Sequence, residues 1–144
     1  MSKVSLLNMI IGFVVIFCSA CLGIFIATDI SDNFIRHSED LNSWYNTLRR
    51  SAHGHFNLFG IIHILFGLTL PYSIWSFAVK RWQTYFLAFG TLAMGPGLWI
   101  RAMVEPSDQI DGVGIILGLF ISLALITMIS HAAGILGKYN RIKS

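Results

Sequence analysis

Charged residues are scarce in this chain. Lysine, arginine, aspartate and glutamate make up 12% of its 144 residues, whereas hydrophobic residues make up 55%. A soluble domain usually carries about twice that charged fraction. This shortage excludes an ordinary water-facing surface and indicates that lipid surrounds much of the chain. The chain also lacks a basic block interleaved with aromatic residues, which argues against nucleic-acid binding.

Cysteine and proline are also rare, with two cysteines and three prolines. Cys18 and Cys21 both fall inside an apolar segment, so they do not form the disulfide framework of a small secreted protein. We interpret them as packing residues, with a Cys-x-x-Cys redox or metal pair as the alternative. Because there is no low-complexity or proline-rich linker, a single domain over residues 1–144 is expected.

Several catalytic patterns are missing. No acid lies within the apolar segments, so a carboxylate proton relay lacks its usual groups. A His-Glu-x-x-His zinc motif, a phosphate-binding loop and a recognisable pair of nucleophile and base are all absent from the sequence. Because these patterns are absent, we expect a role without catalytic activity of the chain's own.

What the sequence does contain is four apolar segments, each long enough to cross a bilayer, for which about 20 residues suffice. They cover residues 6–28, 52–78, 82–103 and 112–136. The first is too long for the core of a signal peptide and is interpreted as a crossing helix. The pattern predicts an all-α integral membrane four-helix bundle, with lipids as its surroundings.

The charges are divided between the two sides that four crossings define. One side holds both chain ends, six basic residues and no acid, while the other holds four arginines and all seven acids. An excess of lysine and arginine is typical of the cytoplasmic side, so both termini are predicted to be cytoplasmic. The bacterial inner membrane is the favoured location, with an organelle membrane as the alternative. The six basic residues are Lys3, Lys80, Arg81, Lys138, Arg141 and Lys143.

The first outer loop contains a helical pattern of its own. Ser38 is a plausible N-cap, and the apolar residues that follow it recur with the spacing of one helix face. The spacing predicts a short amphipathic helix in the first outer loop, lying on the membrane surface. A helix packed on the protein itself fits the same pattern equally well. The apolar residues are Leu41, Trp44, Tyr45 and Leu48.

Small residues form stripes on two of the predicted helices. Such stripes let helix backbones approach closely, within the chain or in contact with another subunit. They are Gly12, Ser19 and Gly23 on the first segment and Gly114, Gly118 and Ser122 on the fourth.

Proline and glycine mark interruptions. Pro71 is expected to kink the second segment near its far end, and residues 80–82 are expected to form the turn to the third. Gly95-Pro96-Gly97 should bend or locally open the third helix. Such an opening could line a pore, although a kink that improves packing is the simpler interpretation.

Histidines give the sequence its main chemical signal. On a helix, His53 and His55 point about 200° apart, so they serve different faces and cannot hold one metal ion together. His63 lies between those faces and about two turns deeper. His63 and His131 are each interpreted as residues that make interhelical hydrogen bonds. His53 and His55 are either polar residues bonded to the outer loop or ligands of a haem or metal.

The stretch Ala52-His53-Gly54-His55-Phe56, followed by Gly60, resembles the His-x-His helix of haem–copper oxidase catalytic subunits. In that family the two histidines lie near the outer end of a helix and bind two haems on opposite faces. The resemblance is confined to this short stretch. The oxidases have many more crossings, and their copper-ligating histidine pair has no counterpart here, so oxygen reduction by this chain alone is not expected.

Taken as one part of the oxidase site, the resemblance implies a single haem b site. His53 or His55 would be one axial ligand, and Met103, His37 or a histidine of another subunit would be the second. Arg101 would pair with a haem propionate. Alternatively, Arg101 reaches the headgroups or pairs with Glu105 or Asp108.

A metal site for zinc or copper at His37, His53 and His55 is a further possibility. The leading expectation for function is an accessory subunit that packs against a larger respiratory or redox membrane complex, or against copies of itself. A stand-alone haem b electron-transfer protein and a small-molecule carrier are the alternatives.

Overall fold

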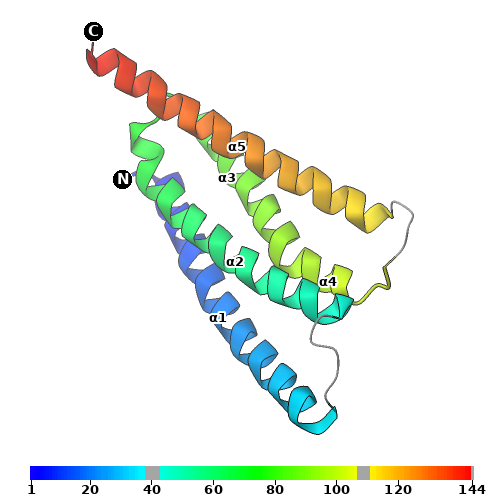
Figure 1. The fold of residues 1–144 in the computed structure, drawn as a ribbon. Helices are drawn as coiled ribbons and strands as arrows, with labels where there is room; N and C mark the ends of the chain where they lie inside the picture. The colour runs from blue at the N-terminus through cyan, green and yellow to red at the C-terminus, as the bar shows by residue number, and fades with distance from the viewer. Residues whose placement is uncertain (38–42, 107–110, 144) are drawn as a thin grey trace.

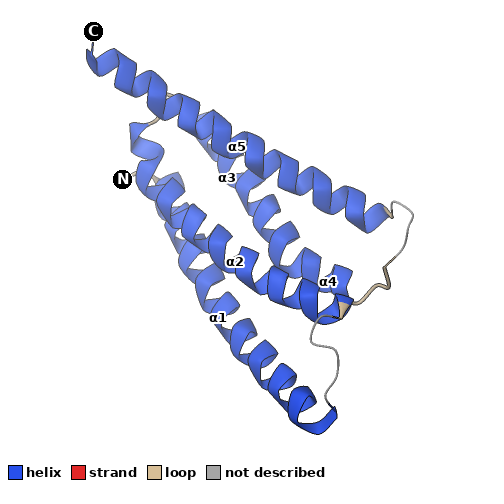
Figure 2. Ribbon diagram, viewed as in Figure 1, coloured by secondary structure: helices blue, strands red, loops and turns tan. Residues whose placement is uncertain are grey.

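The computed structural model describes residues 1–37, 43–106 and 111–143, and all of the regular elements in these ranges are helices (Figures 1 and 2). This confirms the all-α prediction for the described part of the chain. The helices are α1 (Lys3–His37), α2 (Trp44–Thr69), η1 (Leu70–Tyr72), α3 (Phe77–Leu92), η2 (Ala93–Gly97), α4 (Leu98–Ala102) and α5 (Gly112–Lys143).

The helices form four rods that run back and forth along the molecule. α1 and α2 lie side by side, η2 and α4 continue the line of α3, and α5 packs mainly on α3 (Figure 1). Both termini lie at the same end, which also holds the connection from α2 to α3. We call this the basic end, because it carries the six lysines and arginines named above. The opposite, acidic end carries the described acids.

Three helical stretches are long and apolar enough to cross a membrane, judged by length and composition among the described residues. The fourth rod does not qualify as one uninterrupted helix, because α3 itself has only 16 residues. Together with η2 and α4 it continues to Ala102, which at 1.5 Å per residue gives a length of about 39 Å. The three stretches are Lys3–Asp32, Trp44–Tyr72 and Gly112–Lys143.

Close backbone contact joins α1 to α2. A Cβ atom added at Gly12 would lie 2.6 Å from the carbonyl oxygen of Gly60, and one added at Gly67 would lie 2.6 Å from the carbonyl oxygen of Ser5. Only glycine leaves room for two backbones to approach this closely. The small-residue stripe predicted on the first segment therefore forms a packed helix interface.

The stripe predicted on the fourth segment behaves differently. A Cβ atom added at Gly118 would meet nothing within 4 Å, and one added at Gly114 would touch only the side chain of Asp111. Ser122 is exposed and its hydroxyl donates back to the carbonyl oxygen of Gly118, at 2.8 Å. Within the described residues this stripe contacts no other helix. It is therefore not an interface between the described helices of this chain.

The Gly95-Pro96-Gly97 triplet opens the helix as predicted. Proline has no backbone N–H to donate, so the regular hydrogen-bond pattern cannot pass through Pro96. The chain adopts the wider π-helix over η2 instead. The ring of Phe56 from α2 packs directly against Gly95 and occupies the space that a side chain would need there.

The connection between α2 and α3 differs from its prediction. Pro71 does not kink a longer helix; it lies in η1, where α2 ends. Ser73 is extended, and the hydroxyl of Ser76 accepts from the backbone N–H of Val79 and so caps α3. The turn therefore precedes residues 80–82, which lie inside α3. Serine caps, which the hydropathy pattern does not register, decide this boundary.

The start of α2 also differs from its prediction. Ser43 is the N-cap, with its hydroxyl accepting from the N–H of Asn46, and the helix runs from Trp44 to Thr69 without a break. The predicted cap at Ser38 and the residue Leu41 lie outside the described residues. From Trp44 onward there is no separate surface helix, because nothing in this sequence interrupts the helical hydrogen bonds.

The small apolar core lies where all four rods meet. It consists of buried side chains from α1, α2, η1, α3 and α5, and most remaining large apolar side chains face outward. The core residues are Val4, Phe59, Phe66, Leu70, Leu87 and Ala124, with Ile62 and Met94 packed against them.

We predict that Gly12→Ala destabilises the fold by about 1–3 kcal/mol, the usual range for overpacking, because the added methyl must push the α1 and α2 backbones apart. Gly118→Ala is the matched control. It meets open space and should leave stability unchanged or slightly raised, since alanine favours the helix. Unfolding in mixed detergent micelles, followed by circular dichroism, measures both. Equal stability of the two variants would contradict the proposed α1–α2 contact.

Candidate functional site

His53 connects α2 to α1. Its Nδ1 lies 2.9 Å from the carbonyl oxygen of Ser19 and 3.1 Å from the Ser19 hydroxyl, which also donates to the carbonyl oxygen of His53 at 3.0 Å. The imidazole ring packs on Gly23, where an added Cβ would lie 2.6 Å from its Cε1 atom. Among the described residues, His53 is thus bonded to α1, and it is only partly exposed.

His55 points away from α1, as its spacing from His53 requires. Its Nδ1 lies 2.8 Å from the carbonyl oxygen of Ser51 and 3.2 Å from the Ser51 hydroxyl, so both partners belong to the preceding turn of α2. The side chain is half-buried. The sequence therefore predicted correctly that the two histidines serve different faces of one helix.

Both rings have the same orientation relative to their partners. A carbonyl oxygen can only accept, so Nδ1 of each ring carries a proton, and in the neutral ring Nε2 is then the atom with a lone pair. Histidines that bind metals typically donate their other N–H to a backbone carbonyl in this way. The difference lies in the surroundings, because the ring of His53 is packed against Gly23 and Ser19 of α1. The described hydrogen bonds of His55 lie within its own helix.

Arg101 is held by groups at the acidic end. Its guanidinium forms an ion pair with Asp111 at 2.8 Å and lies 5.1 Å from the ring centre of Trp44. The acidic partner is thus Asp111, whereas the sequence suggested Glu105 or Asp108. Glu105 contributes only its backbone oxygen, at 3.5 Å, and Asp108 lies outside the described residues.

Met103 follows α4 and is 65% exposed. In residues 1–37, 43–106 and 111–143, no hydrogen bond or ion pair joins Met103 or Arg101 to His53 or His55. The same ranges contain no group of three or more metal-binding side chains. The structure does not describe the side chain of His37. The residues that the sequence proposed for a haem site are thus not joined by any described contact.

Arg49 is a buried charge that the sequence analysis did not single out. It is 1% exposed and pairs with Asp29 of α1 at 2.5 Å. Three aromatic rings surround its guanidinium, with ring centres at 4.6–5.6 Å. The spacing of Tyr45 and Arg49, four residues apart on one helix, was the available signal. The rings are those of Phe25, Tyr45 and Trp99.

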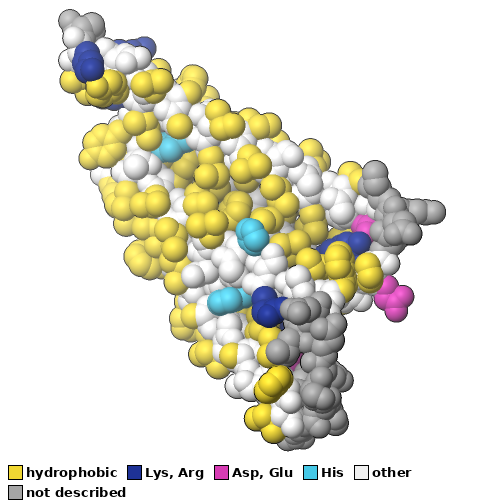
Figure 3. All heavy atoms as spheres, viewed as in Figure 1, with side chains coloured by type: hydrophobic (Ala, Val, Ile, Leu, Met, Phe, Trp, Pro, Cys, Tyr) yellow, Lys and Arg dark blue, Asp and Glu magenta, His cyan; other side chains and the backbone are white. Residues whose placement is uncertain are grey.

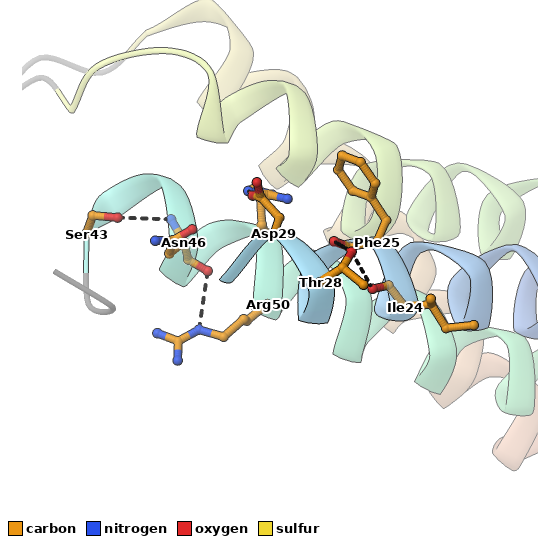
Figure 4. A network of polar contacts seen from close by, with 8 residues as sticks. Ile24, Phe25, Thr28, Asp29, Ser43, Asn46 and Arg50 are labelled. Atoms are coloured by element: carbon orange, nitrogen blue, oxygen red, sulfur yellow. Dashed lines mark hydrogen bonds and ion pairs between the residues drawn. The ribbon is translucent and has the colours of Figure 1, made fainter. Parts of the chain in front are cut away.

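Figure 4 shows polar residues near this cluster, with Asp29 and Phe25 on α1 and the first turns of α2 beside them. Asp29 reaches across from α1 beside Asn46, whose backbone oxygen accepts from Nε of Arg50 at 3.3 Å. Thr28 is bonded within α1, to the carbonyl oxygens of Ile24 and Phe25. The Nε and Nη2 atoms of Arg49 have no partner in the described residues. The guanidinium is therefore held mainly by one carboxylate and by cation–π contacts.

His63 makes the interhelical bonds that its position predicted. It is fully buried, with Nδ1 2.9 Å from Oδ1 of Asn8 on α1 and Nε2 3.1 Å from the hydroxyl of Thr91 on α3. Asn8 donates its amide to the hydroxyl of Thr84 and to the carbonyl of Val4. Its Oδ1 must therefore accept, which places the proton of His63 on Nδ1. This network ties three helices together and leaves His63 no free ligand atom.

His131 on α5 also has the packing role that was expected. Its Nε2 lies 2.8 Å from the hydroxyl of Thr69 on α2, and its ring lies 4.1 Å from the ring of Phe66. Its Nδ1 has no partner among the described residues. The contact is one of the links between α5 and α2.

Comparisons with protein-family models, curated proteins and solved structures found no match for this chain. The functional argument therefore depends on the side chains described above. Of these, His55 bonds within α2, while His53, His63 and His131 each bond between helices.

We predict that Asp29→Asn lowers the free energy of unfolding by about 3 kcal/mol, because it leaves the buried guanidinium of Arg49 without a counter-charge. Replacing both partners, in Arg49→Met with Asp29→Asn, should restore part of that loss, since no unpaired charge then remains buried. Detergent unfolding of the two single variants and the double variant gives the coupling between them. Additive losses would show that the pair does not interact.

Proposed function

We propose that this chain is an integral membrane protein with four crossings, in which α3, η2 and α4 together make the third. The outward faces of the helices support insertion, because large apolar side chains lie exposed along them. Phe17, Ile24 and Ile129 are each about 70% exposed, at 69%, 69% and 71%. Figure 3 shows hydrophobic side chains spread over the middle of the face drawn. Lipid is the solvent that such a surface requires.

The orientation that we propose has both termini in the cytoplasm. The basic end holds both chain ends and the α2–α3 connection, and lysine and arginine are enriched on the cytoplasmic side of membrane proteins. Described acids such as Asp29, Glu105 and Asp111 belong to the other end. A bacterial inner membrane is the location that we propose.

Cysteine labelling tests the four crossings. In a chain carrying Cys18→Ser and Cys21→Ser, we expect Ser2→Cys and Ser76→Cys to react with a membrane-impermeant maleimide only after the cytoplasmic side is opened. Glu105→Cys should react in intact cells. The cysteine-free chain measures background labelling. If Ser2→Cys and Ser76→Cys reacted from opposite sides, the number of crossings would be wrong.

We further propose that the chain is an accessory subunit of a larger respiratory or redox membrane complex and that His55 supplies one axial ligand to haem b. The observation that supports this is the hydrogen bond from Nδ1 of His55 to the Ser51 carbonyl oxygen. In the neutral ring, Nε2 then has a lone pair with which the half-buried side chain can bind a metal. A haem b bound there would supply one-electron transfer. No described contact joins His55 to another residue that could bind haem iron. We therefore propose that a partner subunit supplies the second axial ligand.

The outer surface of α5 supports association with a partner. Gly114, Gly118 and Ser122 form a stripe of small residues that no described helix covers. In lipid, such stripes are typical of helix–helix contacts, since apolar association by itself is weak there. A pore at Gly95-Pro96-Gly97 is not favoured, because the ring of Phe56 packs against Gly95.

The haem proposal is tested by extracting the tagged chain in mild detergent from cells supplied with haem. We expect larger membrane subunits to copurify and a reduced-minus-oxidised spectrum with the bands of haem b. His55→Ala should abolish those bands. His53→Ala is the matched control; it removes the hydrogen bonds to Ser19, so it should lower stability and leave the position of the bands unchanged.

Two outcomes would contradict this proposal. A flat spectrum from the copurified complex would exclude haem, and loss of the bands only in His53→Ala would assign the ligand to the other histidine. If the bands were present in the chain without any partner, they would instead support a stand-alone electron-transfer protein.

A further inference from the structure

A groove of about 470 Å³ runs between α3 and α5, near the basic end. Its volume lies within the range of small-molecule sites in proteins. Most of its wall is apolar, and two rings of α3 form one side: Trp82 and Phe86, with ring centres 5.8 Å apart and planes tilted by 30°. The residues that line the groove are Val79, Trp82, Gln83, Phe86, Ile126, Thr127 and Ser130.

Two polar side chains of this groove have unmet hydrogen-bonding capacity. Gln83 is 4% exposed and Thr127 is 1% exposed. Gln83 donates from Nε2 to the hydroxyl of Ser130 at 2.9 Å. Among the residues that the structure describes, its Oε1 atom has no partner, and neither does the hydroxyl of Thr127. Because Thr127 lies one helical turn before Ser130, the two unpaired groups belong to the same part of the groove. Buried polar atoms normally have partners, so a missing group is indicated here.

The chemistry of that missing group follows from the two atoms. Oε1 of Gln83 can only accept, so the group must donate, while the hydroxyl of Thr127 can donate in return. A hydroxyl group meets both requirements. None of the lining residues is charged, so a neutral molecule is favoured over an anion. The rings of Trp82 and Phe86 favour a flat aromatic body, which packs well on aromatic side chains.

We propose that this groove binds a neutral, membrane-soluble aromatic alcohol of the phenol or quinol class. Its hydroxyl donates to Oε1 of Gln83 and accepts from Thr127, and its ring lies along Trp82 and Phe86. The site is separate from His55. Gln83 lies within the first two turns of α3, near the basic end, whereas His55 lies in the first half of α2, nearer the acidic end. The inference therefore holds whether or not haem is bound.

The experiment uses 4-octylphenol as the probe and octylbenzene, which lacks only the hydroxyl, as its partner. Isothermal titration calorimetry on the full chain in lipid nanodiscs, with empty nanodiscs as the blank, gives both affinities. We expect the phenol to bind about tenfold more tightly, the effect of a hydrogen bond made in an apolar site. Thr127→Val and Gln83→Met should each remove most of that difference.

The matched control is Thr28→Val, which removes a hydroxyl bonded only within α1 and should leave the affinity for the phenol unchanged. Thr127→Val breaks no hydrogen bond of the described residues, so the variant is expected to fold. Equal binding of the two probes would overturn the proposal and leave the groove as a place for lipid chains. Absence of binding, or unchanged preference in both groove variants, would overturn it as well.

Discussion

The close approach of α1 and α2 is the constraint on which the rest of the structure depends. Gly12 and Gly60 let the two backbones touch, and no larger residue could replace either without moving a helix. Once the helices are this close, short side chains can bond across the gap. Ser19 reaches His53 and Asn8 reaches His63 only because the glycines set this distance. Steric fit and hydrogen bonding thus act on the same interface.

Polar contacts hold these helices together in places where a soluble protein would use an apolar core. The core itself is small, and many large apolar residues face outward. When the surroundings are as apolar as the interior, burying a leucine gains little, and van der Waals packing and hydrogen bonds decide how helices associate. The network around His63 and the ion pair of Arg49 with Asp29 are the two places where this is clearest.

The two ends of the molecule differ in their chemistry. At the acidic end, aromatic rings and a carboxylate enclose Arg49, and His55 keeps an unshared lone pair. Towards the basic end, the groove between α3 and α5 contains neutral polar atoms without partners. The two proposals, a haem ligand at His55 and a neutral alcohol in the groove, each follow from these local side chains.

The helical class, the opening at Gly95-Pro96-Gly97 and the opposite directions of His53 and His55 could all be predicted from the amino-acid sequence. They follow from local properties, namely apolar length, the missing proline N–H and the helical repeat. The packing of the helices was needed to show that the Gly12 stripe is covered within the described chain while the Gly118 stripe is not. It alone buried Arg49 and distinguished His53 from His55. The reason is that a repeat specifies which residues share a face, whereas the neighbour of that face depends on how all the helices pack together.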